Sequence, residues 1–361
     1  MKIYIVKETT IDEKRVSLVP DVAKKFIKDG FDVFLEKDAG YMSKFTDEDY
    51  SSLGVNIDNN HENISDADII FCVRMPDDSL INKIKSGACL IGLLNPYDNE
   101  EKLELLSKKG INAFSMELIP RSPRAQSMDV LSSQSNLAGY KAIINSASLY
   151  NKAMPMMMTA AGTIAPAKIF IMGVGVAGLQ AIATAKRTGA VVFATDVRMA
   201  SKEQVESLGG KFLTVEGSEN LETEGGYAKE ASDEFKKKQE ELLSETLKKI
   251  DIVICTALIP GKKAPLIIKS NMLDNMQAGS VIYDLAAIQG GNTALTEVDK
   301  IVENNGVRIM GESNILNKLP ISASSLYAKN MFNFVDNLFD KENKKININL
   351  EDEIIEKTLI K

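Results

Sequence analysis

The stretch Lys168-Ile-Phe-Ile-Met-Gly-Val-Gly-Val-Ala-Gly178 decides the fold of this chain. Its apolar start predicts a β-strand, and residues 176–188 predict a helix that Gly189 ends. Residues 190–195 then predict a second strand, which runs directly into Asp196. This order of strand, glycine turn, helix, strand and acid is typical of a dinucleotide-binding domain built on a doubly wound parallel sheet.

Each part of this pattern has a mechanical reason. Gly173 permits a tight turn, Gly175 lets the backbone approach a pyrophosphate, and Gly178 lets the helix pack closely on the strand. The helix that begins at Val176 offers N–H groups and a positive dipole end to the phosphates. Asp196 can accept hydrogen bonds from ribose hydroxyls and would repel a 2′-phosphate, which favours NAD(H) over NADP(H). The alternative is a βαβ unit whose glycines serve packing alone.

Composition limits the other classes of function. The chain has 361 residues, enough for two domains, and a net charge of −7 without a basic cluster, which argues against nucleic acid as a partner. Its three cysteines have no metal-ligand spacing, so we predict buried thiols in a reducing compartment and no metal site. No apolar run is long enough to cross a bilayer, so the chain itself is expected to be cytoplasmic.

The rest of the chain also alternates between strands and helices. Before the glycine turn this alternation predicts a doubly wound α/β unit without a glycine fingerprint, with strands at 2–6, 31–35, 67–73, 88–94 and 111–114 and helices at 20–29, 79–85 and 100–109. After Asp196 it predicts helices at 201–208 and 229–249 and strands at 251–255, 281–284 and 307–310. Residues 154–158, rich in methionine, are predicted to be apolar packing.

Two further helices set the predicted domain boundaries. A long helix at 132–154 is expected to carry the chain into the second domain, and one at 321–338 to return it to the first. We therefore predict two Rossmann-like domains. The first comprises residues 1–135 and 325–361, and the second, residues 136–324, binds NAD(H) in the cleft between them.

Two motifs carry a family resemblance. Arg124-Ala-Gln-Ser-Met-Asp-Val-Leu-Ser-Ser-Gln-Ser-Asn-Leu-Ala-Gly139 and Gly173-Val-Gly-Val-Ala-Gly-Leu-Gln-Ala-Ile-Ala-Thr-Ala-Lys186 closely resemble the NAD(H)-binding alpha component of proton-translocating NAD(P) transhydrogenase. The resemblance covers nearly the whole chain. The wider superfamily includes alanine dehydrogenase, which shares the Lys7-Glu8 and Arg15-Val16 pattern.

The resemblance implies a function that needs partners. This chain would bind NAD(H), a beta subunit would bind NADP(H), and hydride would pass directly between the two nicotinamides. A membrane-spanning subunit would couple the transfer to proton translocation. The chain would then be a homodimer docked peripherally on the cytoplasmic face of the inner membrane.

The resemblance also implies site residues. The nicotinamide end would be surrounded by Arg121, Gln126, Asp129 and Ser132, with Ser127 and Met128 lining the same segment. Toward NADP(H), the Gln126 amide could donate and accept hydrogen bonds. The adenosine end would use Val176, Asp196, Val197 and Arg198, with Gly226, Gln239 and Leu258 elsewhere in the second domain. Residues 224–229 correspond to a mobile loop in the family.

Several of these residues have simpler interpretations. Arg121 and Asp129 could form an ordinary salt bridge between domains. Ser132 could cap the long helix. Tyr227 could be surface packing.

A proton argument separates the two family activities. A dehydrogenase acting on an amino acid must move a proton as well as a hydride, whereas transfer between two nicotinamides needs only their alignment. In alanine dehydrogenases a lysine, a histidine and an aspartate serve the substrate; the matching positions here hold Arg74, Asn95 and Ile288. Ile288 also departs from the acidic residue expected in transhydrogenases. The single histidine, His61, is predicted in a surface loop. Alanine dehydrogenase is therefore the second choice, and an NAD-sensing module is the alternative from another class.

Overall fold

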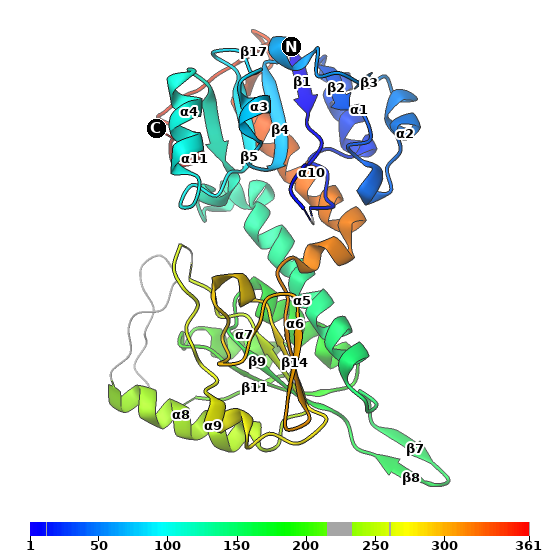
Figure 1. Cartoon of the computed structure of the whole chain (residues 1–361), viewed down its shortest axis with the longest axis vertical. Coiled ribbons are helices and arrows are strands. Elements are labelled where there is room, and N and C mark those ends of the chain that lie inside the picture. The colour runs from blue at the N-terminus through cyan, green and yellow to red at the C-terminus, as the bar shows by residue number, and fades with distance from the viewer. Residues whose placement is uncertain (12, 215–232, 260, 361) are drawn as a thin grey trace. The chain divides into compact units, whose positions relative to one another are not determined.

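The computed structural model describes residues 1–11, 13–214, 233–259 and 261–360 (Figure 1). The chain divides into two compact units, Met1–Gln134 with Leu316–Lys361 (unit 1) and Ser135–Ile315 (unit 2). Each unit is built on its own parallel sheet, so the predicted α/β class with two doubly wound sheets is confirmed. Among the described residues, no helix combines the length and the apolar character needed to span a bilayer.

Unit 1 has a fully parallel sheet with the strand order β3-β2-β1-β4-β5-β6. Its strands are β1 (Lys2–Ile5), β2 (Asp32–Glu36), β3 (Asn56–Asp58), β4 (Ile69–Arg74), β5 (Cys89–Leu93) and β6 (Asn112–Ser115). Its helices are α1 (Pro20–Lys28), α2 (Asp47–Ser51), α3 (Asp78–Ile81), α4 (Glu100–Lys108), α10 (Pro320–Leu338) and α11 (Glu353–Thr358), with the 3₁₀ helix η4 at Pro123–Met128. A short pair, β16 (Phe339–Asp340) and β17 (Lys345–Ile346), follows α10.

The sheet of unit 1 is covered on both faces. Side chains alternate along β1, so that Ile3 lies in one core cluster and Tyr4 in the other. The first cluster includes residues of α10, whose Phe334 ring lies 5.4 Å from the ring of Phe114. Burying a phenylalanine side chain stabilises a fold by about 1.5–3 kcal/mol, so α10 is an integral part of this unit although it comes late in the chain.

Unit 2 has the strand order β11-β10-β9-β12-β13-β15-β14, and only β14 is antiparallel to its neighbour. Its sheet consists of β9 (Lys168–Met172), β10 (Val191–Thr195), β11 (Lys211–Phe212), β12 (Ile252–Cys255), β13 (Val281–Asp284), β14 (Ile301–Asn304) and β15 (Val307–Gly311). Its helices are α6 (Val176–Arg187), α7 (Ser201–Ser207), α8 (Asp233–Leu247) and α9 (Ser270–Leu273), and α5 (Val130–Leu149) contains the boundary between the units. The chain changes direction across the sheet between β9 and β12, where ligands of such sheets bind.

The predicted packing of residues 154–158 is largely wrong. The helix α5 ends at Leu149, and a hairpin of β7 (Met157–Thr159) and β8 (Gly162–Ile164) follows. Met154 is buried, but Met156, Met157 and Met158 are 59%, 45% and 77% exposed. Pro155 cannot continue a helix, and Gly162, at φ +134°, lets the chain turn back on itself, so these methionines stand on a surface hairpin.

The cysteines agree with the sequence prediction. Cys72, Cys89 and Cys255 are buried and unbridged. Burial raises the pKa of each thiol, that of Cys89 to about 12. They are packing residues of the two sheets rather than reactive groups.

Candidate functional site

The glycine turn of unit 2 lies at the carboxyl end of its central strand β9. A side chain on Gly178 would place its Cβ 2.0 Å from the carbonyl oxygen of Gly173, so helix and turn touch through backbone alone. Gly173 itself has a φ of +93°. By contrast, apart from its neighbours in the chain, no atom of the described residues lies within 4 Å of the position that a Cβ on Gly175 would take. The backbone at Gly175 is therefore open to close approach by a ligand.

Helix α6 begins directly at this opening. Val176 is its first residue and is 39% exposed, and Gly175 before it provides no side-chain cap. The first N–H groups of a helix have no acceptor within the helix, and its first turn here contains no acidic residue. These donors and the positive end of the helix dipole suit an anion such as a pyrophosphate.

Asp196 follows β10 and binds the glycine turn directly. Its Oδ2 accepts a 2.7 Å hydrogen bond from the backbone N–H of Val174. Arg198 donates to the same carboxylate through its backbone N–H (2.9 Å), Nε (2.9 Å) and Nη2 (3.0 Å). Although burial would raise it, these hydrogen bonds and the Arg198 charge hold the pKa of Asp196 below its usual value. The acid is therefore a carboxylate at neutral pH. In the sequence, Val197 separates Asp196 from Arg198.

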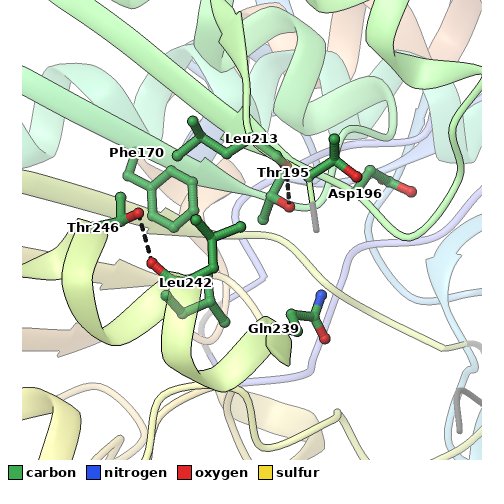
Figure 2. Close-up of a pocket in the computed structure, with 9 residues that line it drawn as sticks. Phe170, Thr195, Asp196, Leu213, Gln239, Leu242 and Thr246 are labelled. Atoms are coloured by element: carbon green, nitrogen blue, oxygen red, sulfur yellow. Dashed lines mark hydrogen bonds between the residues drawn. The ribbon is translucent and has the colours of Figure 1, made fainter. Parts of the chain in front are cut away.

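A small hollow lies beside Asp196 (Figure 2), with a cavity volume of ≈ 10 Å³, about enough for one water molecule. It is formed by the ends of β10 and β11, by the face of α8 and by one β9 residue, and it is lined by Phe170, Thr195, Asp196, Leu213, Thr214, Gln239, Leu242, Leu243 and Thr246. The Thr195 hydroxyl donates to the carbonyl of Leu213 at 2.9 Å, which joins the two strand ends. Its walls are partly apolar, and Asp196 and Gln239 are among its polar groups.

The end of β12 is tied to the same turn. The hydroxyl of Thr256 donates to the carbonyl of Gly173 at 2.8 Å. Asn292, fully buried, accepts from the N–H of Ala257 at 3.1 Å and donates to its carbonyl at 2.9 Å. Leu258 comes next and is 46% exposed. Sequence reasoning missed Thr256 and Asn292; the Gly290-Gly291 pair directly before Asn292 is the signal that could have indicated a turn there.

The predicted nicotinamide segment lies in unit 1, on η4. Gln126 and Ser127 are exposed, whereas Met128 is only 6% exposed and belongs to the core of the unit. Met128 therefore anchors the segment in the core of unit 1. Arg121 is exposed just before η4.

Helix α10 holds this segment from behind. Asn330, 6% exposed, donates from Nδ2 to the carbonyl of Ser127 at 2.8 Å and accepts from the hydroxyl of Ser133 at 2.7 Å. Asn333 donates to the same Ser127 carbonyl at 2.9 Å. At the outer side, Arg124 forms an ion pair with Asp352 at the start of α11. None of these partners was predicted, because they come from the far end of the chain.

Asp129 is the cap of α5. Its Oδ1 accepts from the backbone N–H of Ser132 at 2.8 Å, and its Oδ2 accepts from the Ser132 hydroxyl at 2.5 Å. Ser132 therefore does not cap the helix, as the simpler interpretation had it. Asp129 is the cap, and Ser132 donates to it. The pair is one rigid group at the helix N-terminus.

The three positions that serve the substrate in alanine dehydrogenases are occupied differently here. Arg74 donates from Nε to Oε2 of Glu13 at 3.0 Å, and Glu13 also pairs with the buried Arg15 at 2.7 Å. Asn95 donates to Asp98 at 2.7 Å, and Ile288 is 66% exposed. His61 lies in a loop after β3, with its Nε2 3.8 Å from Glu36. None of the three is a proton donor or acceptor suited to amino acid chemistry.

The predicted site residues thus fall into two groups. Arg121, Gln126, Ser127, Met128, Asp129 and Ser132 belong to unit 1, and Gly173, Gly175, Val176, Gly178, Asp196, Val197, Arg198, Gln239 and Leu258 belong to unit 2. Gly226, Tyr227 and the loop at 224–229 lie outside the described residues. Among the residues that are described, no group of histidine, cysteine and carboxylate side chains has a metal-binding arrangement.

Comparisons with known proteins cover the whole chain. Family models match it as the alanine dehydrogenase/PNT N-terminal domain over residues 4–138 and the alanine dehydrogenase/PNT C-terminal domain over residues 142–361. It is 50% identical to the first part of NAD(P) transhydrogenase subunit alpha of Rhodospirillum rubrum, over 100% of this chain and 96% of that protein. It is 47% identical to the protein of the same name from Rickettsia prowazekii, over 100% of this chain and 94% of that protein.

A solved structure agrees. The crystal structure of transhydrogenase from Sinorhizobium meliloti superimposes with a TM-score of 0.90 at 46% identity, covering 99% of this chain and 98% of that one. The alanine dehydrogenase of Methanococcus maripaludis is 28% identical over 84% of this chain and 76% of that protein. The similarity is thus much greater to transhydrogenase subunits than to that amino acid dehydrogenase.

Proposed function

This chain belongs to the alanine dehydrogenase/PNT family, and on that premise we propose that it is the NAD(H)-binding alpha subunit of a proton-translocating NAD(P) transhydrogenase. The observation that carries the proposal is the arrangement in unit 2, where Asp196 accepts a hydrogen bond from the glycine turn directly before the start of α6. In this function hydride passes directly between NAD(H) and NADP(H), and partner subunits couple the transfer to proton translocation.

The residues of unit 2 fit NAD(H). The open backbone at Gly175 and the N–H groups at the start of α6 would hold the pyrophosphate. Asp196 would accept from the ribose hydroxyls, while Gln239 and Leu258 would contact the nucleotide. We propose that unit 2, close to the predicted residues 136–324, acts as the NAD(H)-binding domain, and that unit 1, close to the predicted 1–135 with 325–361, forms the other domain.

The nicotinamide end is proposed to use Arg121, Gln126, Asp129 and Ser132. When bound, NAD(H) supplies or accepts the hydride. The exposed amide of Gln126 can donate to one nicotinamide and accept from the other, which aligns the two rings. Asp129 and Ser132 are fixed to one another, so their contribution is to orient the segment. No proton has to be exchanged at this site.

The proposed partners are a beta subunit that binds NADP(H) and a membrane-spanning subunit. The relatives are named as alpha subunits, a name that implies an assembly of several chains. Through these partners the chain would sit on the cytoplasmic face of the inner membrane. The exposed face of η4 that carries Gln126 and Ser127 is then the surface that the NADP(H)-binding subunit must approach.

We also propose a homodimer, with the β7–β8 hairpin as part of its contact (Figure 1). Every residue of both strands is exposed, including the paired Met157 and Ile164, each 45% exposed. An isolated hairpin with such short strands is only marginally stable in water, and flexible methionines pack well against a second surface. A second copy of the chain would cover these residues.

Reconstitution tests the function. The purified chain mixed with the NADP(H)-binding subunit should reduce an NAD analogue with NADPH, and neither protein should do so alone. The second candidate, alanine dehydrogenase, is supported by family membership, but Arg74, Asn95 and Ile288 oppose it. Robust turnover of NADH, pyruvate and ammonia by the chain alone would overturn the proposal. Firm NADH binding without any transfer in the reconstituted system would instead indicate an NAD sensor.

A further inference from the structure

The charge pair at the end of β10 joins one residue suited to each of the two pyridine dinucleotides. A carboxylate at this position accepts from the ribose hydroxyls of NAD(H), and a nearby arginine is the group that accommodates the 2′-phosphate of NADP(H). Here Asp196 and Arg198 are both present and bound to one another. We propose that Arg198 is a latent 2′-phosphate site that Asp196 keeps closed. Asp196 then acts against NADP(H) in two ways: its charge repels the 2′-phosphate, and its ion pair occupies the arginine that would bind that phosphate.

The geometry shows how firmly Arg198 is held. Its Nε donates to Oδ1 and its Nη2 to Oδ2 of Asp196, so the guanidinium meets the carboxylate with two parallel bonds. Nη2 also donates to the carbonyl of Val174 at 3.1 Å. The side chain of Asp196 is 7% exposed and that of Arg198 is 22% exposed, so water screens the pair only to a limited extent. Bidentate, charge-assisted pairs of this kind are the strong members of their class.

The location is the one at which a 2′-phosphate would lie. Asp196 lines the hollow beside the glycine turn, next to Thr195 and opposite Gln239 on α8 (Figure 2). A phosphate on the adenosine ribose would therefore meet the Asp196 charge first. The same planar fork of donors that now binds the carboxylate is the arrangement that phosphates prefer.

This inference rests on the proposed function and deepens it. Without the pairing, a single carboxylate would exclude NADP(H) by repulsion alone. With it, neutralising Asp196 removes the repulsion and releases a guanidinium at the same position. The change of specificity should then depend on Arg198 and should not follow from the loss of the acid by itself.

Binding of NADH and NADPH to four proteins tests this point: the natural chain, Asp196→Asn, Arg198→Ala and the double variant. The chain contains no tryptophan, so the fluorescence of the reduced nicotinamide can be read without energy transfer from that residue. Asp196→Asn keeps an oxygen for the Val174 N–H and should improve NADPH affinity at least about tenfold relative to NADH. The double variant should lose that improvement, and the gain should weaken steeply with added salt.

The outcomes are separable. If Asp196→Asn gains no NADPH affinity, or if the double variant gains as much, Arg198 is not a latent phosphate site. Arg198→Ala alone leaves Asp196 in place, and it should bind NADPH more weakly than the natural chain in competition with NADH. Tighter NADPH binding by that variant would also overturn the inference. Asp196→Ser replaces Asp196→Asn if the latter does not fold. Failure of the natural chain to bind NADH would instead count against the proposed function.

Discussion

The side-chain amide of Asn330 donates a 2.8 Å hydrogen bond to the carbonyl oxygen of Ser127, the residue that follows Gln126. The same side chain accepts from Ser133 in the first turns of α5, so one buried asparagine joins η4, α5 and α10. The backbone that carries Gln126 is thus held from the core side. This arrangement makes Asn330 a positioning residue for the proposed hydride transfer.

Replacing Asn330 by aspartate removes the donor and keeps the shape. We expect Asn330→Asp to slow hydride transfer about tenfold, because a misplaced backbone at Ser127 shifts the amide of Gln126. NADH affinity should change little, and rapid-mixing measurements of transfer with separate binding titrations would show the split. Ser133→Ala, which removes the bond to Asn330 Oδ1 but leaves the Asn330 donor to Ser127 in place, is the matched control. Equal transfer rates in the natural chain and Asn330→Asp would exclude this role.

Gln126→Asn tests the exposed amide itself. The shorter side chain keeps both polar groups but withdraws them by about one bond length, so transfer should fall strongly while NADH binding stays nearly unchanged. Single-turnover kinetics with the NADP(H)-binding subunit measure this effect. An unaltered transfer rate would remove Gln126 from the site.

Asp129 should separate stability from function. Asp129→Ala loses the helix cap and should lower the free energy of unfolding by about 1 kcal/mol, whereas Asp129→Asn keeps an acceptor for the Ser132 N–H and should lose less. Urea unfolding curves give both values. If hydride transfer recovers in Asp129→Asn together with stability, the residue acts through the cap. If transfer stays low in the stable variant, the negative charge itself is needed.

Glu8 should make stability depend on pH. Burial raises the pKa of Glu8 to about 7. The backbone N–H groups of Val73 (2.6 Å) and Arg74 (3.0 Å) donate to its carboxylate and lower the pKa, but by less than burial raises it. The folded chain then binds this proton more tightly than the unfolded chain, whose carboxyl titrates near pH ~4.3. The stabilisation is complete below the unfolded pKa and is lost as the pH rises toward 7.

The variant Glu8→Gln does not titrate. The free energy of unfolding of this variant, relative to that of the natural chain, should therefore increase by about 1–2 kcal/mol between pH 5 and pH 8. This increase is smaller than the full pKa shift would give, because Glu8 is partly exposed and water screens its charge. Urea unfolding at several pH values measures the difference. A difference that stays constant with pH would contradict the raised pKa.

The hairpin predicts the behaviour of the proposed homodimer. Met157 and Ile164 are cross-strand partners, so Met157→Gln with Ile164→Gln removes one apolar face and should raise the dimer Kd at least about tenfold. Sedimentation velocity at several concentrations checks this. Met42→Gln, at a methionine 48% exposed in unit 1, is the control and should leave the association unchanged. An unaffected dimer in the double variant would place the contact elsewhere.

Much of the fold could be predicted because its signals are local. Buried strands such as β4 and β5 are continuous apolar runs, and the glycine turn, α6 and β10 form one contiguous stretch. The family prediction is confirmed as well. The strand β3 was missed because it is short and polar, Asn56–Asp58. The strand β14 was missed although Asn305-Gly306, both with positive φ, is a typical hairpin turn before β15.

The site was less predictable wherever it depends on distant partners. Asn330 lies far along the chain from Ser127, and Asn292 likewise from Ala257, so neither pair leaves a periodic pattern. The pairing of Arg198 with Asp196 is local, but its geometry requires the fold of the β10 end. The predicted roles of Gln126, Asp129 and the nucleotide contacts stay predictions until the variants above are measured.

The division of the chain bears on how it folds during synthesis. Unit 2 is one continuous segment, Ser135–Ile315, whereas unit 1 needs α10 to cover a face of its sheet. Domains emerge from the ribosome in order and fold as units, so the nucleotide-binding half is complete while the earlier half still lacks its closing helix. The strands of unit 1 are therefore translated first, but one face of their sheet stays exposed until α10 has been made. During that interval this apolar face is the part of the nascent protein that chaperones have to shield.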